Sequence, residues 1–394
     1  MANVVSVSPY KPSREYAGQR VYARHLAAIA RQGHVTVLTV ETRPDSIDLA
    51  NVDIVEVPTV PRVLRAAPAR AKKMFLTAAQ LFMGPMRIGV RQGIRTGSLT
   101  KLFRDADVVE LQWAPGISVA RDIRALCPDV RIVAFFHEVL NDPFRTVSWP
   151  GANVIRVLLS LLAVQQKRAE LKAMHYLDAA IVPCQKDADL LVGLGFKGSV
   201  HVETSPIEVS KVVPPVHQGK IVLFSGHFGR PENSTGAKWL IQRVWPNVLQ
   251  QEPRAQLVIA GSSPPKWLCD LGNEGVKITG WVPDLNGYYG EARVFAASLL
   301  SGAGVKLKIL EAMAHNVPVV ATPVAADGIA DLIGEECFLK ISDDPTAFAT
   351  SLVAALRDDE LCRRSASQAT LQIERHYSFE PDAQKIAIYY SQSL

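Results

Sequence analysis

A glycine-broken loop that runs into a lysine-bearing helix is the part of the sequence best suited to chemistry. The segment 302–314 reads GAGVKLKILEAMA. Gly302 and Gly304 let backbone N–H groups approach a ligand closely, and a helix that begins near Val305 would add the positive end of its dipole to the charge of Lys306. This combination predicts an anion-binding site.

Glu311, in the same helix, indicates which class of anion the site would bind. Glu311 lies seven residues beyond Gly304, which is roughly 10 Å along a helix axis at about 1.5 Å per residue. A diphosphate and the hydroxyls of its ribose are separated by a similar distance. The segment therefore suits a nucleoside diphosphate, with lysine on phosphate and carboxylate on sugar hydroxyls. The alternative is a surface helix that carries a Lys308–Glu311 pair at i,i+3 spacing.

Length and composition indicate an ordinary globular protein of two α/β domains. The chain has 394 residues, of which 48% are apolar and 21% charged, and this length exceeds one ordinary core. No secretion signal is recognised and the longest apolar run, 154–164, is too short to cross a bilayer, so a cytoplasmic location is expected. Five scattered cysteines without a C-x-x-C pair argue for reduced thiols and against a zinc site.

The net charge of +5 is modest, but the segment 57–104 contains no acidic residue. Its cations alternate with apolar clusters and include Arg62, Arg65, Arg70, Lys72 and Lys73. This pattern predicts contact with an anionic membrane surface or a lipid phosphate, and hence a peripheral association with the inner face of the plasma membrane. The alternative is a basic helical face over ordinary core. Nucleic acid is not expected, because no zinc-finger, RRM or KH pattern accompanies the charge.

The elements expected along the chain alternate between strand and helix in both halves. A strand at 4–7, a loop at 8–18, a helix at 19–31 and a strand at 34–40 form a βαβ unit of the doubly wound class. Further strands are expected at 53–57, 108–112, 131–136, 179–183, 200–203, 220–224, 256–260, 276–279, 294–298, 317–321 and 337–341. The predicted organisation is an N-terminal Rossmann-like domain at 1–211, a linker at 212–219, a C-terminal Rossmann-like domain at 220–377 and a final helix at 378–394, which is expected to pack back on the N-terminal domain.

A series of short motifs in the second half resembles a known family. The motifs are FSG at 224–226, PEN at 231–233, LVIAG at 257–261, GWVPD at 280–284, the segment 302–314 and PVVAT at 318–322. In this order they resemble the nucleotide-sugar-dependent glycosyltransferases of the "glycosyl transferases group 1" type, which are mostly retaining. The resemblance implies a GT-B fold, in which two doubly wound α/β domains face each other across a cleft.

The resemblance assigns roles to residues at matching positions. Lys306 is implied to neutralise the donor diphosphate and Glu311 to accept hydrogen bonds from the ribose. Val282 matches the position whose backbone contacts the base, and Gly18 matches the glycine of the N-terminal phosphate loop. His137, at the end of a strand, matches the histidine that reaches the transferred sugar, where a neutral imidazole can hold a hydroxyl. Gly302, Gly304 and Val305 are implied to bind the donor through backbone amides.

Two departures from the family pattern bear on the donor site. Many members have a glutamate eight residues before the position of Glu311, where this chain has Ala303. In the loop after Gly226, members often have an arginine followed by a lysine, whereas here His227, Arg230 and Asn233 occupy that loop. Either Arg230 or His227 is expected to assist Lys306.

These features predict a hexosyltransferase that uses a nucleoside diphosphate sugar as substrate, with neither a cofactor nor a metal. The expected acceptor is a glycan or lipid-linked saccharide in the synthesis of a cell-surface glycan. The alternatives are a nucleotide-sugar epimerase or phosphorylase on the same fold, and a non-catalytic protein that binds nucleotide sugars or glycans.

Overall fold

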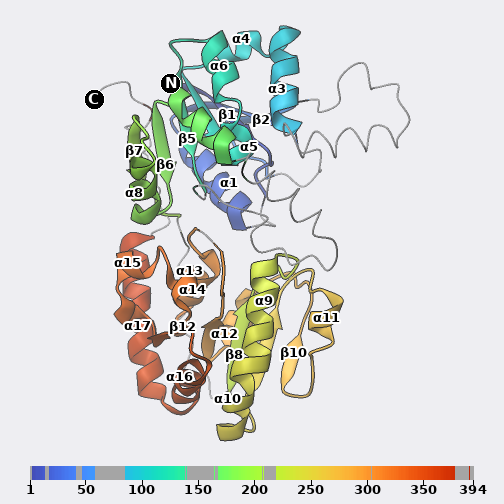
Figure 1. Ribbon diagram of the computed structural model, residues 1–394, viewed down its shortest axis with the longest axis vertical. Helices are drawn as coiled ribbons and strands as arrows, with labels where there is room; N and C mark the ends of the chain where they lie inside the picture. Colours follow the sequence, from blue (N-terminus) through green and yellow to red (C-terminus); the bar gives the residue numbers. More distant parts are fainter. Residues whose placement is uncertain are drawn as a thin grey trace. The chain divides into compact units, whose positions relative to one another are not determined.

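The computed structural model describes residues 2–13, 17–40, 47–57, 85–137, 139, 164, 167–205, 207, 219–302, 304–377 and 390. Their contacts define two units: an N-terminal one that runs to Ser205 and takes in Tyr390, and a C-terminal one from Ile207 to Tyr377. The expected linker lies outside the described residues except for Gly219, and so does the expected final helix except for Tyr390. Each unit is an α/β layer built on one parallel sheet (Figure 1), which confirms the predicted fold class.

The N-terminal unit contains a seven-stranded parallel sheet in the order β3-β2-β1-β4-β5-β6-β7. Its strands are β1 (Ala2–Ser8), β2 (Gly33–Thr39), β3 (Val52–Glu56), β4 (Val108–Gln112), β5 (Arg131–Phe135), β6 (Ala179–Val182) and β7 (Ser199–Val202). Its helices are α1 (Ala17–Ala30), α3 (Pro85–Arg95), α4 (Thr100–Arg104), α5 (Trp113–Ile117), α6 (Ala120–Leu126), a helical stretch at 167–173, the short η2 (Met174–Tyr176) and α8 (Gln185–Gly193). The strand order reverses between β1 and β4, so the loops after these strands diverge there.

The C-terminal unit contains a six-stranded parallel sheet in the order β10-β9-β8-β11-β12-β13. Its strands are β8 (Ile221–Ser225), β9 (Gln256–Ala260), β10 (Val276–Ile278), β11 (Val294–Ala297), β12 (Val319–Ala321) and β13 (Lys340–Ile341). Its helices are α9 (Pro231–Trp239), the π-helical η3 (Leu240–Val244), α10 (Trp245–Gln251), α11 (Lys266–Cys269), α12 (Asn286–Glu291), α13 (Leu307–Ala314), α14 (Pro323–Ala326), α15 (Ala330–Ile333), η4 (Glu335–Cys337), α16 (Pro345–Arg357) and α17 (Asp359–His376). The strand order reverses between β8 and β11.

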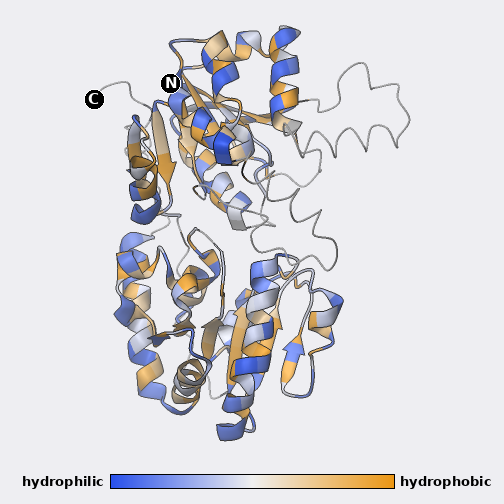
Figure 2. Ribbon diagram, viewed as in Figure 1, coloured by the Kyte–Doolittle hydropathy of each residue, from blue (hydrophilic) through white to orange (hydrophobic). Residues whose placement is uncertain are grey.

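The apolar runs of the sequence become the buried strands of both sheets. Figure 2 shows hydrophobic colour along the strands and mixed colour along the helices. Parallel strands covered on both faces read as continuous apolar runs, and residues 222–225 of β8 and all of β11 are buried accordingly. Strand β4 also buries two long polar side chains completely, those of Glu110 and Gln112.

Two expected boundaries are wrong by a few residues. Helix α13 begins at Leu307 rather than near Val305, because Gly304 has φ 69° and Lys306, its N-cap, has the non-helical angles φ −92° and ψ 89°. The strand expected from residue 337 begins only at Lys340, because Cys337 closes the short helix η4.

Candidate functional site

The loop after β8 packs directly against the lysine side of α13. A Cβ atom at Gly226 would lie 2.8 Å from Lys308 Nζ and 3.2 Å from the Asn233 amide. Lys308 Nζ donates a 2.5 Å hydrogen bond to Asn233 Oδ1 and lies 5.0 Å from the centroid of the Phe224 ring. Ligands bind in such sheets beside the loops where the strand order reverses, which here are the loops after β8 and β11. Lys308 therefore lies next to this position.

The surroundings of Lys308 disfavour its positive charge. The pKa of Lys308 is lowered to about 7, mainly by burial and also by the positive charges of Arg230 and, to a smaller extent, Lys306. The carboxylates of Glu232 and Glu311 act in the opposite direction but do not balance these effects. Part of the side chain still reaches solvent. An anionic group bound beside Lys308 would restore its charge.

Glu311 lies one helical turn from Lys308 and is held by aromatic neighbours. The Tyr289 hydroxyl lies 3.4 Å from Glu311 Oε2 and 3.1 Å from Ser225 Oγ. The His315 imidazole lies 2.7 Å from the Glu311 carbonyl through Nδ1, and its ring stacks on Tyr289 with centroids 4.9 Å apart. Lys308 and Glu311 therefore lie about one turn apart on the same helix.

The glycines before α13 adopt conformations that suit glycine. Gly302 has φ 127° and Gly304 has φ 69°, and a Cβ at Gly302 would lie 3.9 Å from the Glu232 side chain. Val305 is half-buried, and Lys306 is 7% exposed. Ala303 lies outside the described residues. The structure therefore brings the predicted glycine loop beside the start of α9.

Three other predicted donor residues lie in neighbouring loops of the same unit. His227 Nδ1 lies 2.8 Å from Ser262 Oγ, and Arg230 pairs with Glu232 at 2.5 Å. Val282 is half-buried in the loop after β10. The residues that sequence reasoning missed here are Asn233 as the partner of Lys308, and Tyr289.

In the N-terminal unit, His137 follows β5 and is held as a neutral imidazole. Its ring stacks on Trp113 with centroids 3.8 Å apart and an 8° angle between the planes, and its Nε2 lies 2.8 Å from Gln112 Oε1. Burial lowers the pKa of His137 to about 3, and the positive charge of His25 adds to this effect while Glu110 opposes it. The neutral form that the sequence argument requires is therefore the one present at neutral pH.

Trp113 organises the residues around His137, a role that no sequence motif indicated. Its backbone is left-handed, with φ 56°, a conformation that is costly for a bulky residue and marks a constrained position. Tyr10 and Tyr22 pack edge-on against its ring, with centroids 5.1 Å and 5.4 Å away. A Cβ at Gly18 would lie 3.6 Å from the same ring. Gly18 and His137 thus both lie beside the ring of Trp113, the residue that follows strand β4.

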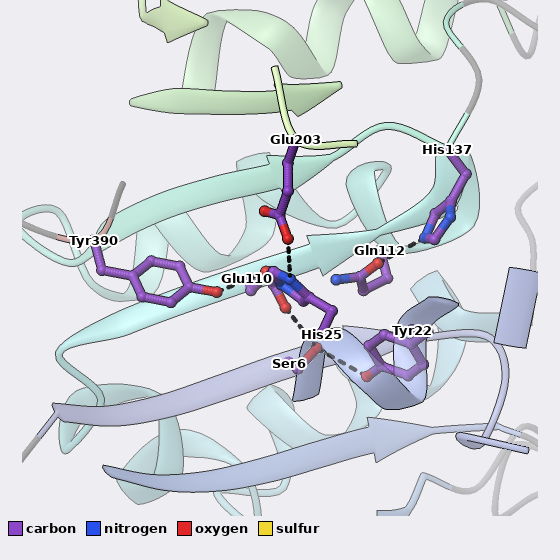
Figure 3. Close-up of polar contacts among 8 residues, drawn as sticks. All are labelled: Ser6, Tyr22, His25, Glu110, Gln112, His137, Glu203 and Tyr390. Carbon is purple, nitrogen blue, oxygen red and sulfur yellow. Dashed lines mark hydrogen bonds and ion pairs between the residues drawn. The ribbon is translucent and has the colours of Figure 1, made fainter. Parts of the chain in front are cut away.

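Beside this cluster lies an ionic network in which His25 and Glu110 are buried and Glu203 and Tyr390 are partly buried (Figure 3). His25 Nε2 lies 2.5 Å from Glu110 Oε1, and His25 Nδ1 lies 3.3 Å from Glu203 Oε1. Ser6 and Tyr390 also donate hydrogen bonds to Glu110, at 3.2 Å and 2.7 Å. Burial alone would lower the pKa of His25, but the two carboxylates outweigh it and raise the pKa to about 10. Burial alone would likewise raise the pKa of Glu110, but His25 outweighs it, so that the pKa is lowered.

Three expectations are not addressed by this geometry. Arg62, Arg65, Arg70, Lys72 and Lys73 lie outside the described residues. No helix in the described part of the chain has both the length and the apolar content needed to cross a membrane. Within the same described residues, no group of three or more His, Cys, Asp or Glu side chains is arranged to hold a metal ion.

Sequence comparisons match the chain to known proteins over part of its length. The family "Glycosyl transferases group 1" matches residues 219–358. An uncharacterised 44.6 kDa protein of the cps region of Klebsiella pneumoniae is 30% identical over 165 residues, or 40% of this chain and 42% of that protein. A phosphatidyl-myo-inositol mannosyltransferase of Mycobacterium leprae is 30% identical over 163 residues, or 40% of this chain and 43% of that protein. The chain thus aligns with less than half the length of these curated relatives.

Solved structures match over nearly the whole chain and establish the fold. Sucrose-phosphate synthase from Thermosynechococcus elongatus is 19% identical, with a TM-score of 0.70 over 99% of this chain and 98% of that one. HepE from Anabaena, in complex with UDP and glucose, is 13% identical, with a TM-score of 0.67 over 98% and 99%. Both matches include the two parallel-sheet units. On this evidence, the chain has the GT-B fold, and its residues 219–358 are similar to the glycosyl transferases group 1 family.

Proposed function

We propose that the protein is a retaining hexosyltransferase that moves a hexose from a nucleoside diphosphate sugar to an acceptor hydroxyl. The observation that supports it best is the helix α13, which carries the under-compensated cation Lys308 and the anchored carboxylate Glu311 one turn apart. The cation suits the diphosphate and the carboxylate suits the ribose. UDP and glucose in the crystal structure of HepE, a protein of similar fold, are compatible with such a ligand.

The chemistry proposed here depends on stabilising the leaving group. As the bond between the anomeric carbon and the diphosphate oxygen breaks, negative charge grows on the diphosphate. Lys308 and Lys306, together with the N-terminal amides of α13, would stabilise that charge, and they do so best because they are positioned beforehand. The acceptor oxygen forms its bond on the face that the diphosphate leaves, and its proton passes to a phosphate oxygen. These cations supply the positive charge without a metal.

His137 is proposed to hold a hydroxyl of the transferred sugar. Its ring is neutral and fixed by Trp113 and Gln112, so it can accept a hydrogen bond without carrying a charge. Gly18, Gly226 and the loop with His227, Arg230 and Val282 would complete the donor site. With alanine at position 303, recognition of the sugar would depend on these groups and on backbone amides.

The acceptor is proposed to be a lipid-linked or membrane-proximal saccharide in the synthesis of a cell-surface glycan. The similarity to a protein of a cps region supports a role in polysaccharide synthesis. The acid-free segment 57–104 supports an anionic, partly apolar partner. A cytoplasmic enzyme that associates peripherally with the membrane should sediment with vesicles of anionic lipid at low salt and be released at high salt. Absence of sedimentation at low salt would contradict the membrane part of the proposal.

A donor panel tests the function itself. Thermal shifts with UDP, GDP and ADP select the nucleotide, turnover of the matching sugar donors is then measured with acceptor present and absent, and NMR of the product gives the anomeric configuration. Lys306→Ala and Glu311→Ala should each reduce turnover more than tenfold. Full turnover in either variant contradicts the site assignment, and donor conversion without an acceptor would indicate an epimerase instead.

A further inference from the structure

Gln112 lies between the buried ionic network and His137. Figure 3 shows the amide with its nitrogen toward the Glu110–His25 pair and its oxygen toward the His137 imidazole. The residue is completely buried, at 0% exposure. Glu110 and Gln112 are two residues apart on β4, so their side chains project from the same face of the sheet.

The charge of Glu110 sets the orientation of this amide. The carboxylate is ionised, since His25, Ser6 and Tyr390 all donate to it and its pKa is lowered. An ionised carboxylate only accepts hydrogen bonds. The opposite orientation would point the Gln112 carbonyl oxygen at this negative charge, whereas the observed one turns the amide nitrogen toward it (Figure 3), although Nε2 forms no hydrogen bond with any described residue. The Gln112 amide is accordingly among the groups that keep the pKa of Glu110 low.

The amide orientation in turn sets which His137 nitrogen carries the proton. Gln112 Oε1 can only accept, so the nitrogen 2.8 Å away, His137 Nε2, must donate. In a neutral imidazole the other nitrogen is then an acceptor. Among the described residues, none forms a hydrogen bond with His137 Nδ1. The neutral ring therefore offers one acceptor nitrogen to a ligand.

We propose that Gln112 is a positioning residue, which converts the fixed charge of the Glu110–His25 pair into a single tautomer of His137 with Nδ1 as the acceptor for a hydroxyl of the transferred sugar. The part that concerns the sugar rests on the proposed function. The part that concerns the tautomer rests on the geometry alone, so the two can fail separately.

Nitrogen-15 NMR of histidine-labelled protein measures the tautomer directly. His137 should show only the Nε2–H form at neutral pH. The Gln112→Met variant, which has a similar length but no amide, should show a mixture of the two tautomers, because nothing then selects one nitrogen. The matched control is Tyr390→Phe, which removes a different donor to Glu110 but leaves the His25 pair, and should keep the single tautomer. An Nδ1–H form in the native protein, or an unchanged single tautomer in Gln112→Met, would overturn the proposal.

A pH titration adds a readout that a purely structural role would not change. Gln112→Glu places a carboxylate beside Nε2 and should raise the pKa of His137 by about 1 to 3. The other charged groups that act on the ring, His25 and Glu110, remain in place. A His137 pKa that stays at its native value in folded Gln112→Glu protein would contradict the positioning role. If this variant does not fold, the tautomers of Gln112→Met still decide the question.

Turnover then links the tautomer to the reaction. Loss of one properly oriented hydrogen bond should reduce the turnover of Gln112→Met by about two- to tenfold, with no comparable loss in Tyr390→Phe. Mixed tautomers with full turnover would overturn the role of Nδ1 toward the sugar. Failure of every sugar nucleotide to bind would instead contradict the proposed function and leave the tautomer result standing.

Discussion

Each unit contains a basic side chain with a strongly shifted pKa, His25 in the N-terminal unit and Lys308 in the C-terminal unit, and the two shifts have opposite directions. His25 in the N-terminal unit contacts two carboxylates, and its pKa rises to about 10. Lys308 in the C-terminal unit contacts a neutral amide oxygen and an aromatic ring beside another cation, and its pKa falls to about 7. A compensated buried charge maintains structure, whereas an under-compensated one is prepared for an anionic ligand. On this basis we distinguish a structural ion pair around His25 from a proposed ligand site around Lys308.

The largest expected effect comes from breaking the compensated pair. His25→Leu leaves Glu110 buried without its main partner and should reduce the free energy of unfolding by about 3–5 kcal/mol, as measured by urea denaturation. The control is His34→Leu, because His34 and Asp53 form an exposed pair in the same unit, at 51% and 73% side-chain exposure. That substitution should change the free energy by no more than about 0.5 kcal/mol. Equal effects of the two substitutions would show that the buried pair is not a framework.

Removing the under-compensated cation should affect catalysis instead. Lys308→Met is expected to lower turnover by about 100- to 1000-fold, the usual cost of losing one preorganised group that stabilises developing negative charge. Stability should change little or increase, because the substitution removes an enclosed charge. The matched control is Lys277→Met, which changes an exposed lysine on β10 and should retain full turnover. A Lys308→Met enzyme with native turnover would remove Lys308 from the donor site.

The pH dependence of stability provides a smaller effect. The folded pKa of His25, about 10, exceeds its ordinary value of 6.5, so its contribution is complete below pH 6.5 and is lost as the pH rises toward 10. Glu110 has a lowered pKa, so its contribution is present above its ordinary value of 4.5 and is lost as the pH falls. The melting temperature of the native protein, relative to that of His25→Leu, should be highest between about pH 4.5 and 6.5. A difference that grows between pH 7 and 10 would contradict this assignment.

The sequence allowed the fold to be predicted, because continuous apolar runs separated by helical patterns specify covered parallel strands. It also singled out the glycine loop, Glu311 and His137, which stay predicted site residues. It did not identify Gln112 or Trp113, because a glutamine and a tryptophan after an apolar run resemble the ordinary end of a strand. The contact between Gln112 Oε1 and His137 Nε2 and the left-handed backbone of Trp113 become visible only in the structure.

Lys308 illustrates the same limit in the donor site. From the sequence, Lys308 was expected only to form a surface pair with Glu311. Family members often have a lysine in the loop after Gly226, and this chain has Asn233 there instead. In the structure Asn233 binds Lys308 instead, so a cation reaches this loop from α13. A contact between residues 75 positions apart depends on how the two elements pack, which local patterns do not encode.

Lys308 is proposed to bind an anionic ligand and to become protonated when that ligand binds. The number of protons taken up on nucleotide binding tests this most directly. The nucleoside diphosphate that binds most tightly among UDP, GDP and ADP is titrated into the protein at pH 8, by calorimetry in buffers of different ionisation enthalpy. With a pKa of about 7, Lys308 is mostly neutral at this pH and should take up close to one proton when the diphosphate binds beside it. The same titration of Lys308→Met should show no such uptake. Tight binding with no proton uptake by the native protein, or equal uptake by Lys308→Met, would contradict the account.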